Sequence, residues 1–375
     1  MHIVMLSSTH PPTDARIFRR EAKTLSDAGH KVTILTLANG NFDSKDGIEF
    51  IVFPRKKNRF RRVINSRKLR KTALELNADL YIIHDAEILY IGRWLTRRGK
   101  KFIYDAHEPY PEFISEKKWV PRLLKPAVKK IVEYEEARGV KHSSGVIVAM
   151  KEILQRLSRP NLPTLILRNF PPLSDIVAMT GERENLIIYV GGIMRERFGL
   201  EMIEMAKSFA PGEILDGYKL EILGPVFDPE YARRCSAEAD KHRGYLHYSG
   251  AYVDYKLALE RMKKALIGIS LIVPTPKYNR TLSSKVFDYM ACGAVPVTTW
   301  LSPYEGLISE NDGPVFIQPG EEKHIQQILA DLLKDPVALR QRAELCLKSA
   351  REKFNWEPEG KELLKFISKF EKNSD

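Results

Sequence analysis

Cysteine is scarce in this sequence of 375 residues, which contains only Cys235, Cys292 and Cys346. Their wide spacing gives no metal-ligand pattern and fits a reducing compartment. Long hydrophobic runs are also missing, because no stretch approaches the roughly 18 apolar residues that cross a bilayer. The apolar N-terminal run Met1–Leu6 has no basic leader, so it predicts a buried first strand rather than a signal peptide. These absences predict a cytoplasmic protein without a transmembrane helix.

Acidic residues are missing from one long segment. Ten Lys or Arg and no Asp or Glu lie between Arg55 and Lys71, and six more basic residues lie between Lys117 and Lys130, within a net charge of +12. A solvated basic face is the simplest interpretation of such runs. A nucleic-acid surface is disfavoured because Phe60 is the only aromatic residue in the first run. The second run mixes apolar and basic residues, as helices on anionic membranes do.

Hydrophobic residues make up 43% of the chain, which is enough for two ordinary domains with their own cores. Short apolar runs alternate with helical patterns along both halves, and this alternation predicts parallel sheets with crossover helices. The expected strands are Ile3–Leu6, Lys31–Thr36, Leu80–His84, Lys101–Asp105, Gly145–Val148, Leu165–Leu167, Leu186–Val190, Leu220–Leu223, Leu246–Tyr248, Gly268–Ile272 and Ala294–Val297. The expected helices include Ala15–Ala28, Leu200–Ser208, Pro229–His242, Tyr255–Lys264 and Ser284–Cys292. The pattern breaks at Arg168–Pro172, where we expect a domain boundary.

One segment, Asn279–Val297, combines features that suit a nucleotide. It reads as a polar turn, a helix, a glycine stop and a buried strand. Ser283 and Ser284 can cap the helix, so that its first backbone N–H groups and Lys285 face the space before it. Asp288 lies one turn beyond Ser284 and can look out on the same face. Backbone donors with a lysine suit a diphosphate, and a carboxylate one turn away suits the ribose hydroxyls of a nucleotide-linked substrate.

This segment resembles the donor-site motif of family-4 glycosyltransferases of the GT-B fold, which often reads Asn-x3-Pro-x-Lys-x2-Glu-Tyr-Met-Ala-x-Gly-x-Pro-Val. The chain has Ser283 in place of the proline, Asp288 in place of the glutamate, and one additional residue between Gly293 and Pro296. Arg280 stands where the Glu-x7-Glu form of the motif has its first carboxylate. Outside this segment the resemblance is looser, but it covers nearly the whole chain.

The resemblance implies an α/β architecture of two Rossmann-like, doubly wound domains that face each other across a cleft. Residues 1–170 would form the acceptor-side domain, residues 171–355 the nucleotide-sugar-binding domain, and residues 356–375 a last helix that crosses back to the first domain. The implied reaction is a retaining transfer of a sugar from a UDP- or GDP-linked donor to a lipid-linked or other glycan acceptor, in the biosynthesis of a surface polysaccharide.

A lipid-linked acceptor would place the protein peripherally on the inner face of the plasma membrane. We therefore expect Arg55–Lys71 and Lys117–Lys130 to bind an anionic membrane surface, with no nucleic-acid partner. Each Lys or Arg near such a surface contributes on the order of 1 kcal/mol.

Ligands of open parallel sheets bind beyond the carboxyl ends of the strands, and this rule selects a loop after the first strand. The loop Ser7–Arg16 resembles the acceptor-side loop of family members that carry Asp-x-Arg. The resemblance implies acceptor contacts from Thr13, Asp14 and Arg16. Thr13 or Asp14 would cap the following helix in any case. Arg16 in the first turn opposes the helix dipole, which favours a functional contact.

A second loop follows the expected strand Lys101–Asp105. It holds His107 between a buried strand and two prolines that fix the loop. Similar enzymes carry a histidine here that contacts the donor sugar near the reacting carbon, which implies that role for His107. Glu108 could steer the acceptor or merely act as a cap for the next segment. His84 and Asp85, after another strand, are possible acceptor contacts.

Glycines in the loop Tyr189–Gly199 follow a strand and let the backbone approach phosphate closely. The family usually has Arg or Lys directly before a glycine here, which implies Arg197, or Arg195 with a shifted gap, as the cation that neutralises the leaving diphosphate. Tyr252, after a further strand, could stack on the base or simply pack. The predicted catalytic residues are His107, Arg197 and Lys285, and the predicted donor-binding residues are Gly192, Arg195, Tyr252, Asn279, Thr281, Ser283, Ser284 and Asp288.

No cofactor or metal is expected, because Arg197, Lys285 and helix N–H groups can drive diphosphate departure by preorganised charge. Two alternatives remain open. A GT-B sugar-nucleotide epimerase would need acid/base carboxylates, for which the sequence offers only Glu108 and Glu112. A non-catalytic GT-B protein that binds a membrane or a nucleic acid would use the basic run that begins at Arg55.

Overall fold

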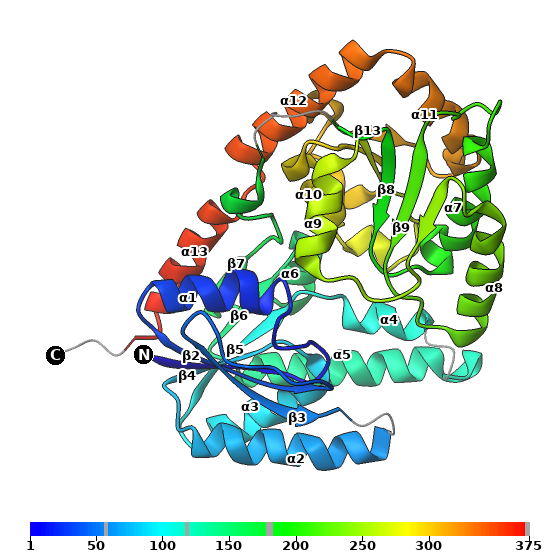
Figure 1. The fold of residues 1–375 in the computed structure, drawn as a ribbon. Coiled ribbons are helices and arrows are strands. Elements are labelled where there is room, and N and C mark those ends of the chain that lie inside the picture. Colours follow the sequence, from blue (N-terminus) through cyan, green and yellow to red (C-terminus); the bar gives the residue numbers. More distant parts are fainter. Residues whose placement is uncertain (56–58, 117–119, 178–182, 372–375) are drawn as a thin grey trace. The chain divides into compact units, whose positions relative to one another are not determined.

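The computed structural model describes residues 1–55, 59–116, 120–177 and 183–371 (Figure 1). The chain forms two compact units. Unit 1 consists of Met1–Asn169 and Trp356–Asp375, and unit 2 consists of Phe170–Asn355. The first boundary thus lies one residue before the expected one, and the last helix belongs to unit 1.

Unit 1 is built on a parallel sheet of seven strands in the order β3-β2-β1-β4-β5-β6-β7. Its strands are β1 (His2–Ser7), β2 (Lys31–Ala38), β3 (Ile48–Pro54), β4 (Leu80–Ile83), β5 (Lys101–Ala106), β6 (Gly145–Val148) and β7 (Thr164–Ile166). Its helices are η1 (Ile17–Ala22), α1 (Lys23–Asp27), α2 (Arg59–Glu75), η2 (Ala86–Ile88), α3 (Leu89–Thr96), α4 (Tyr110–Glu116), η3 (Arg122–Leu124), α5 (Lys125–His142), α6 (Lys151–Leu157) and α13 (Trp356–Ser368).

Helices bury both faces of this sheet. Because successive strand residues point to opposite sides, each strand contributes side chains to two cores. In β1, Val4 and Leu6 join a core formed with α2, α3, α5 and α6. Ile3 and Met5 join a second core formed with η1, α1 and α13. Figure 1 shows α1 and α13 on one side of the sheet and α2 and α3 on the other. The near-continuous apolar runs of the sequence reflect this double coverage.

Unit 2 has a second parallel sheet, of six strands in the order β10-β9-β8-β11-β12-β13. Its strands are β8 (Leu186–Val190), β9 (Lys219–Leu223), β10 (Leu246–Tyr248), β11 (Ile267–Ser270), β12 (Val295–Thr299) and β13 (Val315–Ile317). Its helices are α7 (Gly199–Glu204), α8 (Pro229–Ala239), α9 (Tyr255–Lys264), α10 (Ser284–Cys292), α11 (Ile325–Leu333) and α12 (Pro336–Glu352), with 3-10 turns that include η5 (Arg195–Arg197), η6 (Met205–Phe209) and η8 (Tyr278–Arg280). The two parallel sheets confirm the predicted α/β class.

Some elements differ from the expectation. Strands β3 and β13 were not predicted; β3 carries the acidic Glu49, and β13 has only three residues. The helix expected over Ala15–Ala28 begins as a π-helix, η1, and continues as the short α1. Side-chain oxygen Oδ1 of Asp14 accepts hydrogen bonds from the backbone N–H groups of Arg16 and Ile17 at 2.9 and 3.1 Å, so Asp14 caps this helix as predicted. Within the described ranges, no helix has the length and apolar content that a membrane crossing requires.

The last helix, α13, supplies part of the core of unit 1. Leu363 is fully buried in that core, and Nε1 of Trp356 donates a hydrogen bond to Oγ1 of Thr24 at 2.8 Å.

Replacing Leu363 by Ala should therefore lower the free energy of unfolding by about 2–5 kcal/mol, because the substitution leaves a cavity. Urea unfolding followed by circular dichroism measures it. The control Lys361→Ala, on the exposed side of α13, should change stability by no more than about 0.5 kcal/mol. Equal effects would contradict this packing.

Candidate functional site

Both sheets have a point where the strand order reverses. In unit 1, β1 lies between β2 and β4, and in unit 2, β8 lies between β9 and β11. Loops at the carboxyl ends of strands beside such a point form the usual ligand-binding crevice of an open parallel sheet. The loops after β1 and β4 and the loops after β8 and β11 are therefore the places to look for a site in each unit.

In unit 2, the side chain of Lys285 lies directly over Gly191. Gly191 follows β8 and has a φ of 139°, and a Cβ atom placed on it would be 2.3 Å from Cε of Lys285. Only glycine leaves room for this approach and adopts this backbone conformation without strain. Lys285, in the first turn of α10, thus extends across the end of β8 and brings its ammonium group to the glycine loop.

Arg197 reaches the same loop from the turn η5. Its Nη1 donates to the backbone oxygen of Gly192 at 3.4 Å, and its Cζ lies 5.8 Å from the ring centroid of Tyr278. The next residue, Phe198, has a φ of 54°, an unusual value for an aromatic residue. Within the described part of the chain, Nε of Arg197 is buried without a hydrogen-bond partner. A guanidinium with an unused donor is suited to an anionic ligand.

The two cations repel each other. Burial of Lys285 is the main cause that holds its pKa well below the usual range, and the positive charge of Arg197 is the second. The carboxylate of Asp288 opposes this shift. A diphosphate between Lys285 and Arg197 would offset this repulsion and raise the pKa of the lysine. The predicted catalytic pair in unit 2 is thus brought together, with Asp288 close enough to act on it.

The start of α10 differs from the expectation in one respect. Ser283 does not cap the helix with its side chain, because its buried hydroxyl is paired with the hydroxyl of Ser270 at 3.3 Å. Ser284 is the first helical residue rather than a cap. Because the side chain of Ser283 makes no capping hydrogen bond, the first backbone N–H groups of the helix can serve an anion together with Lys285.

The other predicted donor residues are more dispersed. Arg195 stacks on Tyr231, with its Cζ 4.5 Å from the ring centroid, and so points to a different partner from that of Arg197. Tyr252 is 74% exposed in the loop after β10. Asn279 is exposed on η8, and Thr281 donates through Oγ1 to the backbone oxygen of Lys277 at 2.9 Å. Of the two arginines that the sequence left open, the structure brings Arg197 to the glycine loop.

In unit 1, Asp105 at the end of β5 is the centre of a buried network. Arg16 binds it with two hydrogen bonds, from Nε to Oδ2 at 2.9 Å and from Nη2 to Oδ1 at 2.8 Å. Nη1 of Arg16 also donates to the backbone oxygen of Leu167 at 2.9 Å. Burial opposes ionisation of Asp105, but Arg16 and then His107 hold its pKa well below the usual range. Arg16, predicted to contact the acceptor, is buried in this structure and orients Asp105.

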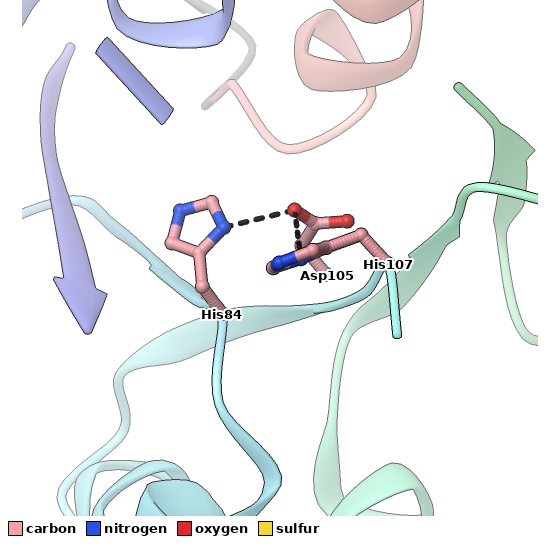
Figure 2. Close-up of side chains that lie close together, drawn as sticks. All are labelled: His84, Asp105 and His107. Atoms are coloured by element: carbon pink, nitrogen blue, oxygen red, sulfur yellow. Dashed lines mark hydrogen bonds and ion pairs between the residues drawn. The ribbon is translucent and has the colours of Figure 1, made fainter. Parts of the chain in front are cut away.

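Two histidines lie beside Asp105 (Figure 2). Nδ1 of His84 is 2.8 Å and Nδ1 of His107 is 3.2 Å from the same oxygen, Oδ2. Candidate ligand atoms of these three residues lie within 4.8 Å of one another, as the ligands of a metal ion would. However, Arg16 is bonded to both oxygens of Asp105, and its charge disfavours a cation there. Hydrogen bonding with Arg16 therefore accounts for this cluster.

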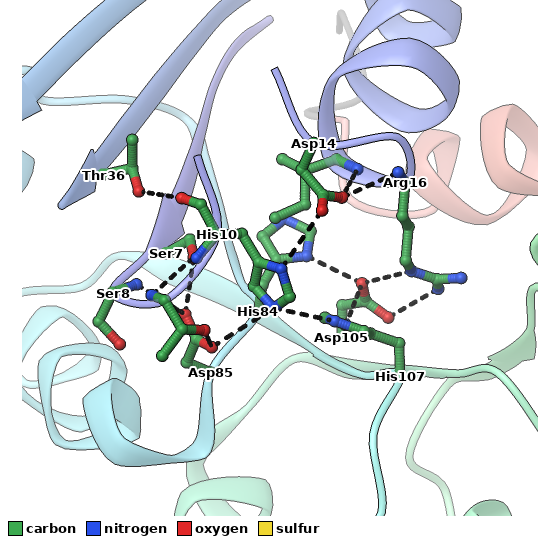
Figure 3. A network of polar contacts seen from close by, with 12 residues as sticks. Ser7, Ser8, His10, Asp14, Arg16, Thr36, His84, Asp85, Asp105 and His107 are labelled. Carbon is green, nitrogen blue, oxygen red and sulfur yellow. Dashed lines mark hydrogen bonds and ion pairs between the residues drawn. The ribbon is translucent and has the colours of Figure 1, made fainter. Parts of the chain in front are cut away.

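Asp85, after β4, is the centre of the second part of the network (Figure 3). It accepts hydrogen bonds from Oγ of Ser7 at 2.8 Å and from the backbone N–H of Ser8 at 2.6 Å. Tyr110 donates to it through Oη at 2.8 Å, and Oγ1 of Thr9 donates to it as well. Although burial alone would raise it, the pKa of Asp85 is lowered to about 2 by the charge of His10 and by these donors.

The network also contains residues that the sequence did not single out. His10 lies between Asp14 and Asp85, with Nδ1 3.3 Å from the first and Nε2 3.7 Å from the second carboxylate. His107 and Asp14 lie in this network (Figure 3). Thr13 and Glu108, their neighbours in sequence, are partly buried. The sequence signal that could have identified His10 was its position in the loop after β1. Its partners come from two other strand ends, which only the fold brings together.

The first basic run is partly used within unit 1. Side chains of residues 56–65 and 115–119 lie outside the described residues. Arg55 donates through Nη1 to the backbone oxygen of Thr9 at 2.9 Å. Arg70 lies over Trp94, with its Cζ 5.0 Å from the ring centroid.

The second basic run presents an exposed mixed surface, here called the α5 stripe. It consists of the exposed residues Leu123, Leu124, Ala127, Lys130, Ile131, Tyr134, Arg138 and Lys141 of η3 and α5. Leu123 is 93% exposed, an unusual position for a large apolar side chain next to basic residues.

The chain is similar to known proteins at two levels. Residues 15–164 match the family described as Glycosyltransferase Family 4, whereas no curated protein matches the sequence. The structure is similar to that of sucrose-phosphate synthase from Thermosynechococcus elongatus, with 14% identity, a TM-score of 0.75 and 98% of each chain covered.

Two further solved structures span the same length. HepE from Anabaena, solved in complex with UDP-glucose, has 13% identity and a TM-score of 0.75, over 98% of this chain and 100% of its own. A glycosyltransferase from Rickettsia africae ESF-5 has 14% identity and a TM-score of 0.68, over 100% of this chain and 99% of its own. At these identities the likeness concerns the fold. The family match covers residues 15–164, less than half of the chain. Together, these comparisons show that the chain is similar to family-4 glycosyltransferases and shares the GT-B fold of these structures.

Proposed function

We propose that this protein transfers a sugar, with retention of anomeric configuration, from a UDP-linked donor to a lipid-linked glycan acceptor in surface polysaccharide biosynthesis. The observation that carries the proposal is the convergence of Lys285 and Arg197 on the loop Gly191–Gly192, beside the first turn of α10, which Ser283 does not cap. This arrangement offers two cations and backbone N–H groups to a diphosphate.

The proposed roles follow from this chemistry. Arg197 and Lys285 would stabilise the negative charge that develops on the leaving diphosphate, without a cofactor or a metal ion. Asp288, one turn into α10, would accept hydrogen bonds from the ribose hydroxyls. His107 would contact the transferred sugar, and the departing phosphate oxygen would help to remove the proton of the acceptor hydroxyl. HepE and the trehalose-phosphate protein from E. coli were solved with UDP-glucose and UDP-2-fluoro glucose, which supports uracil as the base.

We also propose that the α5 stripe holds the enzyme on the inner face of the plasma membrane, close to its acceptor. Ile131 and Tyr134 lie one turn apart on α5, both exposed, with Lys130 and Arg138 beside them. Apolar side chains that enter the headgroup region and basic side chains that bind anionic lipids are the two contributions that an interfacial helix needs. Because the charges of the first run are partly engaged within unit 1, the stripe is the better candidate surface.

The donor site can be tested by titrating the pure protein with UDP in a calorimeter. Arg197→Ala and Lys285→Ala should each raise the Kd for UDP at least tenfold, because each removes one of two cations that face the diphosphate. Each should also lower the rate of UDP-sugar turnover by about 100- to 1000-fold, the usual effect of removing one charge-stabilising donor.

Arg195→Ala is the matched control for the donor site, since that guanidinium stacks on Tyr231, and it should keep the wild-type Kd within about twofold. Wild-type affinity in both the Arg197 and Lys285 variants would refute the donor site. If the wild-type protein binds GDP or ADP in place of UDP, the site stands and the base is corrected. Binding of no nucleotide diphosphate would favour a non-catalytic protein.

The membrane surface can be tested with vesicles of phosphatidylglycerol and phosphatidylcholine. A triple variant, Leu123→Ser, Ile131→Ser and Tyr134→Ser, should bind such vesicles at least tenfold more weakly in a sedimentation assay, because it removes the apolar side chains that would insert. A control triple variant of exposed apolar residues of unit 2, Leu257→Ser, Val337→Ser and Leu345→Ser, should bind as the wild type does. Equal sedimentation of all three proteins would argue against the stripe as the membrane surface.

A further inference from the structure

The rings of His10 and His107 face each other through the same kind of nitrogen atom. Their Nε2 atoms are 3.4 Å apart, and the ring centroids are 5.1 Å apart with planes at 58° (Figure 3). Two nitrogen atoms at this separation attract each other only if one carries a hydrogen and the other a lone pair. The two rings must therefore differ in protonation at Nε2.

The Nδ1 atoms of the two rings further restrict which nitrogen atoms carry hydrogen. Nδ1 of His10 lies 3.3 Å from Oδ2 of Asp14, and Nδ1 of His107 lies 3.2 Å from Oδ2 of Asp105. Nδ1 of His107 makes no hydrogen bond among the described residues, but an ionised carboxylate at these distances repels a lone pair and attracts an N–H group, so both Nδ1 atoms carry hydrogen. With one more hydrogen between the Nε2 atoms, the pair holds three hydrogens on four nitrogens. One ring is thus an imidazolium and the other a neutral imidazole.

The surroundings place the extra charge on His10. Its Nε2 also faces Asp85 at 3.7 Å, whereas the carboxylate beside His107 is already neutralised by Arg16. The titratable or charged groups that face His10 are Asp14 of its own loop, Asp85 after β4, and His107 and Glu108 after β5; Arg55 binds the backbone of neighbouring Thr9. Against the effect of burial, the hydrogen bond to Asp14 and the charges of Asp85 and Asp14 raise the pKa of His10 to about 9.

We infer that His10 is a positioning residue, whose Nε2–H donates to Nε2 of His107 and holds that ring as the neutral Nδ1–H tautomer in one orientation. The benefit to the reaction rests on the proposed function, in which His107 contacts the transferred sugar. A ring clamped between His10 and Asp105 presents a single edge to the substrate. His10 itself does not have to touch the substrate in order to act.

The inference predicts an alkaline loss of function. Because the pKa of His10 is raised above its ordinary value of 6.5, its charged form stabilises the folded site fully below that pH, and the contribution is lost as the pH rises through about 9. Above this pH the hydrogen between the two Nε2 atoms is gone. His107 then loses its hydrogen bond from His10, and turnover should fall.

The experiment is nitrogen-15 NMR of the histidine rings in the full chain, recorded from pH 6 to pH 10. Three proteins are compared: the wild type, His10→Gln and His107→Gln, the last two of which also assign the signals. In the wild type, the His10 ring should stay an imidazolium up to about pH 9, and the His107 ring should show hydrogen on Nδ1 at neutral pH. In His10→Gln, the His107 signal should change to a mixture of tautomers. A control, His142→Gln, on the exposed end of α5, should leave the His107 signal unchanged.

Kinetic measurements provide a second test of the inference. His10→Gln should lower kcat about tenfold and remove the alkaline decline near pH 9, with the Kd for UDP unchanged within twofold. Titration of His10 near pH 6.5, or hydrogen on Nε2 of His107 in the wild type, would overturn the inference. The NMR result needs no activity, so it can fail while UDP still binds, and failure of UDP binding would count against the proposed function alone.

Discussion

The ion pair between Arg16 and Asp105 is the contact on which the candidate site of unit 1 depends. It joins the loop after β1 to the end of β5, and a third hydrogen bond from Arg16 reaches Leu167 just after β7. Asp105 in turn orients His84 and His107. Removal of Arg16 would leave the buried carboxylate of Asp105 without its main countercharge, at a cost of about 3–5 kcal/mol. The geometry of the histidines is therefore set by a residue that has no need to meet the substrate.

The two candidate sites differ in how their charges are balanced. In unit 1, the cations Arg16 and His10 each face carboxylates, so the loops present compensated charges and hydrogen-bonding groups that suit neutral hydroxyls. In unit 2, Arg197 and Lys285 converge on one glycine loop, and each makes the other less favourable. Two neighbouring cations that share one nearby carboxylate, Asp288, suit a diphosphate, and a network of compensated charges suits a sugar acceptor.

The sequence predicted the parts of the structure that depend on local patterns. The α/β class followed from apolar runs, and the helix Ser284–Cys292 and Lys285 followed from one glycine-terminated segment. Arg197 followed from the family resemblance of the loop Tyr189–Gly199. The roles of Arg16 and Ser283 could not be predicted in this way, because their partners, Asp105 and Ser270, are distant in sequence or lie on a different strand end. His10 was missed for the same reason. A histidine in a loop is an ordinary feature until the end of β4 brings Asp85, and the end of β5 brings His107, to its Nε2 atom.

The return of the last helix to unit 1 has a consequence for the newly made chain. Unit 2 is continuous in sequence, and its two ends meet, since the rings of Phe170 and Phe354 are 5.6 Å apart. Unit 1 is completed only by Trp356–Ser368, which covers the face formed by Ile3 and Met5. At about 5–20 residues per second, the ribosome adds the whole of unit 2 before this helix, an interval of roughly 10–40 s. The second half of the protein can thus finish folding while the first half waits, with one face of its sheet uncovered.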